Sequence, residues 1–342
     1  MPTVDVHTHF IPPELLADAA RGQAPDGVAQ EVVDGVPWLV HRQGYRYPVP
    51  PPFHDVEARL AAMDALGVDV AVVSIAPTLF LYWADPDEAA DFCRAANDAL
   101  ARFAAASGGR IVTLATLPLQ APDAAIKELH RAVAHLGLRG AEIGPRVEEV
   151  PLDDPTMLPL LDTAQDLGVP LVLHPYYVGP RSGLADFYLV NLLGNPIQTT
   201  TCAARLILSG TLDDLERLEL VLLHGGGFLP YQIGRMDHGN RVRPEARACR
   251  RPPSEYLRRF TYDTITHAPR PLAFLVSQVG AARVAFGTDY PFDMAGGALD
   301  QQLEGAGLDH DQRERIAWRN AARLFRLDLE ADADPALAPG AP

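Results

Sequence analysis

The sequence predicts an α/β protein built as a (β/α)8 barrel of the TIM type, and two observations carry that prediction. First, eight short apolar segments alternate with stretches of helical periodicity along the 342 residues. Second, several segments are apolar at every position, as at 70–73, 171–173 and 220–223, which is typical of parallel strands buried on both faces. Eight strand–helix units over this length fit a closed barrel. An open doubly wound sheet is the alternative, but no Gly-x-Gly-x-x-Gly follows the first strand, which argues against a dinucleotide-binding version.

The expected elements follow one another in a regular order. Strands are expected at 4–10, 68–75, 110–117, 138–144, 170–174, 220–224, 260–265 and 283–288. Helices are expected at 15–20, 55–66, 86–106, 121–136, 156–167, 196–208, 212–218, 230–238, 271–279 and 311–325. Asp55 can cap the helix that it opens, and Gly67, Gly137 and Gly168 can each end a helix.

Residues 21–54 depart from this order, and we expect them to form an insertion that covers one end of the main domain. The dipeptide Asp34-Gly35 lies between two apolar runs, which indicates a β-hairpin. We expect a single domain over 1–330 that includes the insertion. The segment 331–342 is rich in Ala, Asp and Pro and is expected to be a frayed tail.

Composition excludes several classes of partner. The chain carries 29 basic and 44 acidic residues, a net charge of −15, which argues against nucleic acid or an anionic membrane surface. There is no apolar run of about 18 residues that could span a membrane, and the N-terminal sequence has no secretory pattern. The three cysteines are widely spaced and are expected to be free thiols. Together these features predict a cytoplasmic protein.

Polar residues at the predicted strand ends suggest where the chemistry takes place. His7 and His9 lie two residues apart in the first strand, so their side chains point to the same face. His174, His224 and Asp289 follow the fifth, sixth and eighth strands. Any one of these residues is more simply explained as a turn or core residue. Because the carboxyl ends of barrel strands share one mouth, the set together predicts a functional site.

The residue types in this set favour a metal centre. Three histidines and one aspartate can bind Zn²⁺ or another first-row divalent ion and leave a position open for substrate. The remaining histidine would be free to act as a general acid or base, because its ordinary pKa lies near neutrality. Three glycines follow His224 and allow close approach by the substrate or by another loop.

Longer motifs resemble a known family. The strand-end residues match the amidohydrolase superfamily, and the fold implied is the metal-dependent hydrolase type of TIM barrel. The stretches Phe80-Leu-Tyr-Trp-Ala, His174-Pro-Tyr-Tyr, His224-Gly-Gly-Gly-Phe-Leu-Pro, Gly234-Arg-Met-Asp-His-Gly and Gly287-Thr-Asp-Tyr-Pro-Phe look like the aminocarboxymuconate semialdehyde decarboxylase branch. The likeness runs from about residue 56 to about residue 325. The fourth strand ends near Glu142 and offers no lysine, so a mononuclear site is expected.

The resemblance implies a role for each site residue. A single Zn²⁺ ion, or Mn²⁺ or another first-row ion in its place, would be bound by His7, His9, His174 and Asp289. His224 would be the catalytic acid or base, with Asp289 also taking part in catalysis. Arg235 would reach the active site of a neighbouring subunit and bind the substrate carboxylate, which implies a homodimer.

Substrate contacts are implied for Tyr82, Trp83, Phe292 and Asn191, and here the sequence also departs from the family pattern. The family has an arginine before the first barrel helix that holds a second carboxylate, whereas residues 50–54 read Pro-Pro-Pro-Phe-His. Arg42 and Arg46 of the insertion are candidates to replace it. Asn191 stands where the family has a substrate-facing tryptophan. We therefore expect a small carboxylate substrate that differs from the one implied by the branch name.

The predicted function is metal-dependent, non-oxidative decarboxylation of a small unsaturated or aromatic carboxylic acid, which makes the protein a carboxy-lyase. The alternative is a hydrolase or hydratase that attacks a lactone, an amide or a C=C bond at the same centre, because a fold does not fix a reaction. A third reading, a barrel that keeps a metal only for structure, is less compatible with an open site that retains His224.

Overall fold

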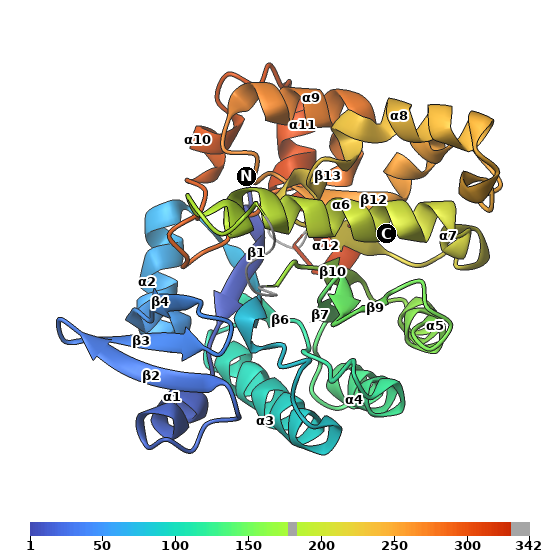
Figure 1. The fold of residues 1–342 in the computed structure, drawn as a ribbon. Helices are drawn as coiled ribbons and strands as arrows, with labels where there is room; N and C mark the ends of the chain where they lie inside the picture. Colours follow the sequence, from blue (N-terminus) through green and yellow to red (C-terminus); the bar gives the residue numbers. More distant parts are fainter. Residues whose placement is uncertain (177–182, 330–342) are drawn as a thin grey trace, which may run out of the picture.

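Eight parallel strands form a closed ring in the computed structural model, which describes residues 1–176 and 183–329 (Figure 1). The strands are β1 (Val4–Phe10), β5 (Val70–Ile75), β6 (Ile111–Thr113), β7 (Ala141–Ile143), β10 (Leu171–Leu173), β11 (Leu220–Leu222), β12 (Phe260–Asp263) and β13 (Val284–Ala285). One sheet has the order β1-β5-β6 and the other has the order β13-β12-β11-β10-β7. A bridge between Ala115 and Ala141 joins them at one seam. At the other seam the Val6 N–H donates to the Phe286 carbonyl at 2.9 Å.

Helices surround the ring on the outside (Figure 1). They are α2 (Val56–Leu66), α3 (Pro86–Ala105), α4 (Pro122–Ala134), α5 (Leu158–Leu167), α6 (Asn195–Leu208), α7 (Thr211–Asp214), α8 (Leu229–Val242), α9 (Pro269–Val279), α10 (Leu299–Leu303), α11 (His310–Glu314) and α12 (Asn320–Phe325), with α1 (Pro13–Ala20) directly after β1. Asp55 caps α2 by accepting a hydrogen bond from the Ala58 N–H at 2.8 Å, as its sequence position predicts. Gly67 and Gly168 end α2 and α5 in the left-handed conformation.

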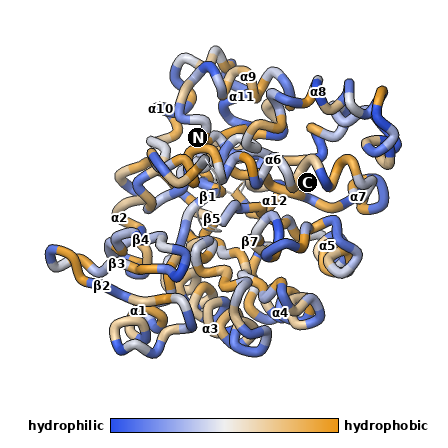
Figure 2. The backbone as a smooth tube through the Cα atoms, in the orientation of Figure 1, coloured by the Kyte–Doolittle hydropathy of each residue, from blue (hydrophilic) through white to orange (hydrophobic). Residues whose placement is uncertain are grey.

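The core has an inner and an outer part. Val172 of β10 and Val221 of β11 pack in one buried cluster with Val4 and Val72 from the opposite side of the ring, so this cluster fills the barrel interior. The larger cluster lies between the strands and their helices. Hydrophilic residues gather on the outward sides of helices such as α4 and α5 (Figure 2). Among the described residues, no helix is both long enough and apolar enough to cross a membrane.

An irregularity in β1 decides which way its histidines face. Its pairing with β5 shifts register between Asp5 and Thr8, which is the effect of one extra residue in a strand. Val4 and Val6 belong to the interior cluster, and after the shift His7 and His9 also face the interior. The strand therefore contributes apolar packing at its start and two imidazoles at its end.

The insertion after β1 forms a small antiparallel sheet of three strands, β2 (Val28–Val33), β3 (Val36–His41) and β4 (Arg46–Pro48). Asp34 and Gly35 join β2 to β3, both at positive φ. The third strand was not among the predicted elements. Buried residues of this sheet, including Leu39 and Tyr47, pack in the outer core cluster with Phe53. The insertion is thereby fixed beside the barrel mouth.

The predicted order of elements is confirmed, but several boundaries differ. β13 is shorter than the predicted 283–288: it ends at Ala285, and the N–H of Phe286 donates to the Ile316 carbonyl and not to the neighbouring strand β12. The helix predicted at 212–218 ends at Asp214, and the one predicted at 311–325 is interrupted by a π-helical stretch, Arg315–Arg319. The two-residue strands β8 (Arg146–Val147) and β9 (Val150–Pro151) and the helix α10 were not predicted. The predicted tail 331–342 lies outside the described residues.

One buried arginine ties the insertion to the barrel. The Arg59 side chain is fully buried on α2, and its guanidinium donates to the backbone carbonyls of Pro52, at 2.9 Å, and His9. It also lies over the ring of Tyr290, 5.4 Å from the centroid. Burial lowers its pKa to about 10, so it remains charged at neutral pH. Arg59 thus connects the end of β1, the end of the insertion and the segment after β13.

Replacing Arg59 with methionine should destabilise the fold. The substitution leaves the buried His9 carbonyl and the partly buried Pro52 carbonyl without this donor, and an unsatisfied buried group costs roughly 1–3 kcal/mol, so we expect a loss of about 3 kcal/mol. Urea-induced unfolding, followed by tryptophan fluorescence, measures this loss. Arg21→Met is the control, because Arg21 forms an exposed ion pair with Asp18 that contributes little. Equal unfolding midpoints for the two variants would contradict the role of Arg59.

Candidate metal centre

Four potential metal ligands meet at the carboxyl-terminal mouth of the ring. His7 and His9 come from the end of β1, His174 follows β10, and Asp289 follows β13. All four are buried, and each offers a ligand atom that lies within 4.8 Å of the others. The strand ends that were predicted to share one mouth therefore do so, and a divalent metal site is the chemistry that this set of donors fits.

The orientation of the histidine rings supports this assignment. Nδ1 of His7 lies 2.8 Å from Oδ2 of Asp263, Nδ1 of His9 lies 3.4 Å from the Ile75 carbonyl oxygen, and Nδ1 of His174 contacts the carbonyl oxygen of Pro175. A proton on each Nδ1 satisfies these acceptors and leaves each Nε2 as a lone-pair donor. Nε2 of His7 and Nε2 of His174 are buried and have no hydrogen-bond partner. Two orphaned buried nitrogens beside a carboxylate are what a bound cation would satisfy.

Asp289 provides the negative charge of the centre. Its Oδ1 lies 3.0 Å from Nε2 of His9 and 3.4 Å from Nε2 of His7. The residue has a φ of 65°, and its N–H donates to the His7 carbonyl at 2.7 Å. This hydrogen bond fixes the aspartate directly opposite the histidines of β1.

Most of the candidate ligands have the protonation state that metal binding needs, a neutral imidazole or an ionised carboxylate. Burial lowers the pKa of His9 to about 4 and that of His174 well below its ordinary value, so both are neutral at pH 7. Although burial opposes ionisation of Asp289, the charge of His7 and the contacts with His224 and His9 hold the Asp289 pKa well below its usual value. His7 differs: burial lowers its pKa, but the charges of Asp289 and Asp263 outweigh burial and raise it to about 9. A metal ion must therefore displace a proton from His7.

His224 lies beside the four ligands without being one of them. Its Nε2 is 3.7 Å from Oδ2 of Asp289, and its ring centroid is 5.1 Å from that of His174. The residue has a φ of 56°, and its N–H donates to Oδ2 of Asp263 at 3.0 Å. The ring is partly exposed and faces the cavity described below, where it can exchange a proton with a bound molecule.

The glycines after His224 serve close packing with neighbouring segments. A Cβ on Gly226 would lie 2.5 Å from the Tyr262 ring, and one on Gly227 would lie 2.4 Å from the Pro196 carbonyl oxygen. Both glycines are at positive φ. The sequence left open whether these glycines allow approach by the substrate or by another part of the chain. At Gly226 and Gly227 it is another part of the chain that approaches.

Two buried carboxylates of the site were missed by the sequence reasoning. Asp263 ends β12 and accepts hydrogen bonds from the His7 ring and from the N–H groups of His224 and Gly225. Asp5 accepts from the N–H groups of His7 and Thr288 and from the Thr288 hydroxyl. Asp263 could have been found, because it ends the seventh strand just as the ligands end other strands. Asp5 gave no such signal, since it lies inside a strand.

Glu142 is fully buried in the middle of β7, but it is not part of the ligand set. Its Oε2 has no hydrogen-bond partner, and burial raises the pKa of this carboxyl to about 8. A carboxyl group that is mostly protonated at neutral pH supplies little charge to a second cation. The position is therefore consistent with the mononuclear site that the sequence predicted.

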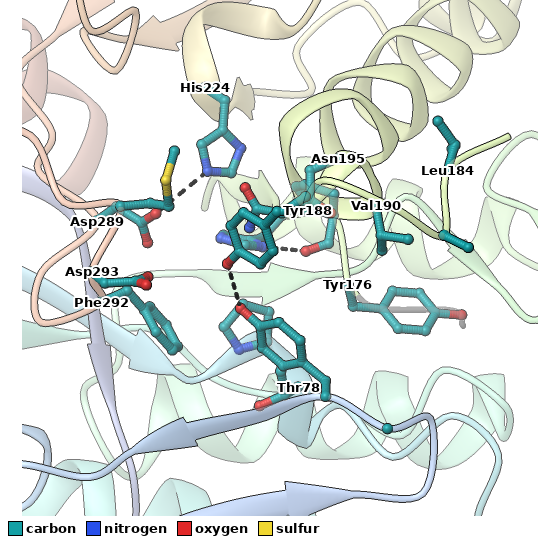
Figure 3. Close-up of a pocket in the computed structure, with 18 residues that line it drawn as sticks. Thr78, Tyr176, Leu184, Tyr188, Val190, Asn195, His224, Asp289, Phe292 and Asp293 are labelled. Atoms are coloured by element: carbon teal, nitrogen blue, oxygen red, sulfur yellow. Dashed lines mark hydrogen bonds and ion pairs between the residues drawn. The ribbon is translucent and has the colours of Figure 1, made fainter. Parts of the chain in front are cut away.

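A cavity of about 290 Å³ opens next to the centre (Figure 3). His174, His224 and Asp289 line it, so the metal site is accessible from this space. The remaining lining residues are Gly44, Tyr45, Pro77, Thr78, Pro175, Tyr176, Leu184, Ala185, Tyr188, Val190, Asn191, Asn195, Phe292, Asp293 and Met294. A second cavity of about 550 Å³ shares Asn191, Asn195, His224, Asp289 and Met294 with the first and continues towards α9.

The predicted substrate-binding residues divide into three groups. Asn191 and Phe292 line the cavity. Tyr82 lies behind it, where it packs on Tyr176 at 5.3 Å and accepts a hydrogen bond from the Gly144 N–H. Trp83 contacts the insertion, because its Nε1 donates to the Asp26 carbonyl at 3.2 Å. Arg235 is exposed on α8 and lines neither cavity.

The two arginines proposed to replace the missing family arginine also lie elsewhere. Arg42 pairs with Asp26 at 3.5 Å and Arg46 pairs with Glu31 at 3.5 Å. Arg42 also lies over the Trp83 ring, and Arg46 lies over the Trp38 ring. Neither lines the cavity, so the described part of the chain supplies no substitute there.

A ring of parallel strands with a buried three-histidine, one-aspartate centre at its mouth, open to a cavity, defines a metal-dependent barrel enzyme. Comparison with known proteins specifies the class further. The amidohydrolase family model matches residues 4–327, and the chain belongs to this family, in its branch of aminocarboxymuconate semialdehyde and γ-resorcylate decarboxylases.

Three relatives illustrate that branch. The chain is 32% identical to the γ-resorcylate decarboxylase of Rhizobium sp. (strain MTP-10005), over 95% of this chain and 98% of the relative. It is 32% identical to the 2-amino-3-carboxymuconate-6-semialdehyde decarboxylase of Dictyostelium discoideum, over 80% and 77% of the two chains. The dihydroxybenzoic acid decarboxylase structure from Polaromonas sp. JS666, which contains manganese and the inhibitor 2-nitroresorcinol, matches with a TM-score of 0.78 at 27% identity, covering 95% of this chain and 97% of that one.

The raised pKa of His7 predicts a pH-dependent metal affinity. Below about pH 9 a proton competes with the metal for this ligand, so the apparent affinity for Zn²⁺ should rise roughly tenfold per unit between pH 6 and pH 8. Competition with a chromophoric chelator measures it. Asp263→Asn removes one of the charges that raise the His7 pKa, so its affinity should level off at lower pH. An affinity that does not change with pH in the wild type would disprove the protonated state of His7.

Proposed function

We propose that the protein is a metal-dependent, non-oxidative decarboxylase, a carboxy-lyase that acts on a small aromatic or unsaturated carboxylic acid. The observation that carries this proposal is the buried ligand set opening on a cavity that also holds His224. The decarboxylase names of the relatives support the reaction type, and several of them refer to aromatic acids. The substrate that we propose is a small carboxylate of this kind.

The ion we propose is a single Zn²⁺ bound by His7, His9, His174 and Asp289, because three imidazoles and one carboxylate suit it. Mn²⁺ is the principal alternative, as the Polaromonas relative contains manganese. When bound, the ion supplies a fixed positive charge that attracts and orients an anionic substrate. The ion would also neutralise the charge that Asp289 brings into the interior.

Decarboxylation without an oxidant needs a proton at the carbon that carries the carboxylate. The new C–H bond prepares that carbon to lose its carboxylate as CO₂, and the electron pair of the breaking C–C bond returns to the unsaturated system. We assign the proton transfer to His224, whose Nε2 faces Asp289 and whose ring borders the cavity. Asp289 would stabilise the protonated imidazole and is catalytic in that sense.

We also propose a homodimer in which Arg235 acts on the partner's substrate. Phe228, just before α8, and Tyr231 on α8 are exposed, and Phe274 on α9 and Leu192 are exposed and line the same cavity. Arg235 follows Tyr231 by four residues and therefore lies on the same face of α8. No ion pair joins its guanidinium to another residue within the described ranges, and it is free to bind a carboxylate as a planar fork. Such an apolar face around a cation suits an interface between two copies.

Two broader features belong to this proposal. Residues 1–330 would form one catalytic domain, with the insertion at 21–54 as part of it. The protein would work in the cytoplasm, since all three cysteines are free and buried. A net charge of −15 makes nucleic acid an improbable partner.

His224→Ala should abolish most turnover while the protein keeps its metal. The variant removes the proton donor but none of the four ligands, so we expect a rate at least about 100-fold lower. Metal content by mass spectrometry and CO₂ release from an aromatic acid test both parts. His310→Ala, an exposed histidine far along the chain, is the matched control. A hydrated or ring-opened product without CO₂ would instead support the hydrolase or hydratase reading.

Mixing two inactive variants tests the action of Arg235 across the interface. Arg235→Ala lacks the carboxylate-binding group, and His224→Ala lacks the proton donor. A mixed dimer contains one site with an intact His224 and an intact Arg235 from its partner. About half of the dimers are mixed, and each of these has one working site out of two. Up to about one quarter of the wild-type activity should therefore return in the mixed sample. Arg241→Ala, on the same helix, is the control and should be active alone. No recovery in a sample proven to exchange subunits would overturn this role.

A further inference from the structure

We infer that Asp5 and Thr288 form a clamp across the seam between β1 and β13, and that this clamp controls how tightly the centre binds its metal ion. The two residues would act as positioning residues, because neither belongs to the ligand set. The inference rests on the proposed metal site but not on the reaction assigned to it. It goes beyond that proposal, since the four ligands alone do not say what keeps them together.

The seam between β1 and β13 has no strand ladder. The two strands lie at the edges of different sheets, and the closest approach to a ladder is a single bridge between Thr8 and Tyr290. The His9 N–H donates to the Tyr290 carbonyl at 2.8 Å, and the Asp289 N–H donates to the His7 carbonyl at 2.7 Å. A seam of this kind depends on individual contacts, because no continuous ladder holds its width.

Three of the four candidate ligands lie on the two sides of this seam. His7 and His9 come from β1, whereas Asp289 follows β13. Oδ1 of Asp289 lies 3.0 Å from Nε2 of His9 and 3.4 Å from Nε2 of His7. A wider seam would move the aspartate away from both histidines. Because a metal ion needs all of its ligands at bonding distance together, the width of the seam bears directly on metal affinity.

The Asp5 carboxylate spans the seam. It is buried in β1, and its Oδ1 accepts hydrogen bonds from the N–H groups of His7 and Thr288, both at 3.0 Å. Its Oδ2 accepts from the Thr288 hydroxyl at 2.5 Å. Within the described ranges, and apart from the contact between His9 and Asp289, the bonds of Asp5 to Thr288 are the only side-chain hydrogen bonds between β1 and residues 284–290.

Thr288 passes this constraint on to the ligand that follows it. Its hydroxyl also accepts from the Tyr290 N–H at 3.2 Å, and its carbonyl accepts from the Gly296 N–H at 2.7 Å. The residues on both sides of Asp289 are therefore held in place. Asp289 itself has a φ of 65°, which is uncommon for residues other than glycine and persists where surrounding contacts impose it.

Asp5 and Asp263 act on different parts of the same centre. Oδ2 of Asp263 contacts Nδ1 of the His7 ring at 2.8 Å and so fixes the ring. Asp5 instead holds the backbone of His7 and the segment that carries Asp289. The loss of an outer contact typically lowers metal affinity about 10- to 100-fold, and we expect a change of that size when the clamp is removed.

Thr288→Val is the direct test, because it keeps the shape of the side chain and removes the hydroxyl. Its dissociation constant for Zn²⁺, measured at constant pH by competition with a chromophoric chelator, should be about 10- to 100-fold higher than that of the wild type. Thr288→Ser returns the hydroxyl and should restore most of the affinity. Thr261→Val is the matched control: Thr261 is equally buried on β12, and its hydroxyl has no hydrogen-bond partner, so its affinity should equal that of the wild type.

A double variant shows whether the two residues act as one clamp. Asp5→Asn turns one acceptor of the carboxylate into a donor, so this variant alone should also bind Zn²⁺ more weakly. If both residues act through their shared hydrogen bonds, Asp5→Asn combined with Thr288→Val should bind about as weakly as the weaker single variant. Urea unfolding of the chelator-treated proteins establishes that each variant is folded in the affinity measurement.

Three results would overturn the inference: wild-type affinity in Thr288→Val, an equal loss in Thr261→Val, or a double variant whose loss is the product of the two single losses. If Asp5→Asn does not fold, the comparison of Thr288→Val with Thr288→Ser and Thr261→Val still decides. A wild type that binds no Zn²⁺ would remove the metal site and the clamp with it. An enzyme that binds Zn²⁺ but releases no CO₂ would contradict only the decarboxylase proposal.

Discussion

The hydrogen bonds of one buried carboxylate, Asp263, hold the catalytic mouth together. Its oxygens accept from the His7 ring at 2.8 Å and from the N–H groups of His224, at 3.0 Å, and Gly225, at 2.7 Å. These partners come from β1 and from the loop after the neighbouring strand β11, whereas Asp263 itself ends β12. A single side chain thereby sets the tautomer of one candidate ligand, His7, and the place of the neighbouring His224. Such outer contacts commonly control how a metal centre binds and reacts.

The buried carboxylates and histidines at the mouth stabilise one another. Asp5, Asp263 and Asp289 are buried carboxylates, and each would be costly there without partners. The histidines satisfy part of that need: although burial lowers the pKa of His7, the charges of Asp289 and Asp263 raise it to about 9, whereas burial lowers the pKa of His9 to about 4. Two Nε2 atoms still lack a partner. A divalent cation would resolve both problems, since it would balance the charge of Asp289, accept the lone pair of His174 Nε2 and take the place of the proton on His7.

Specificity lies in the loops above this centre. The strand ends supply the ligands, whereas the insertion supplies Tyr45, the segment after β10 supplies Tyr188 and Asn191, and the turn after β13 supplies Asp293. Loops on a rigid barrel can change without disturbing the scaffold. In this chain, therefore, the ligands belong to the scaffold and the polar groups of the cavity belong to the loops.

The sequence by itself determined the barrel and the order of its elements, because buried parallel strands are apolar throughout, and it placed four histidines and Asp289 at one mouth. The family resemblance then selected His7, His9, His174 and Asp289 as the candidate ligands, and these four side chains do meet in the structure. Local signals such as Asp55 and Gly67 also placed the ends of α2 correctly. Only the tertiary structure decided which residues support the site. The shift in β1, the roles of Asp5 and Asp263, and the position of Tyr82 behind the cavity depend on contacts between segments up to 283 residues apart. Periodicity and spacing report on neighbours along the chain, and they carry no information about which distant side chains meet.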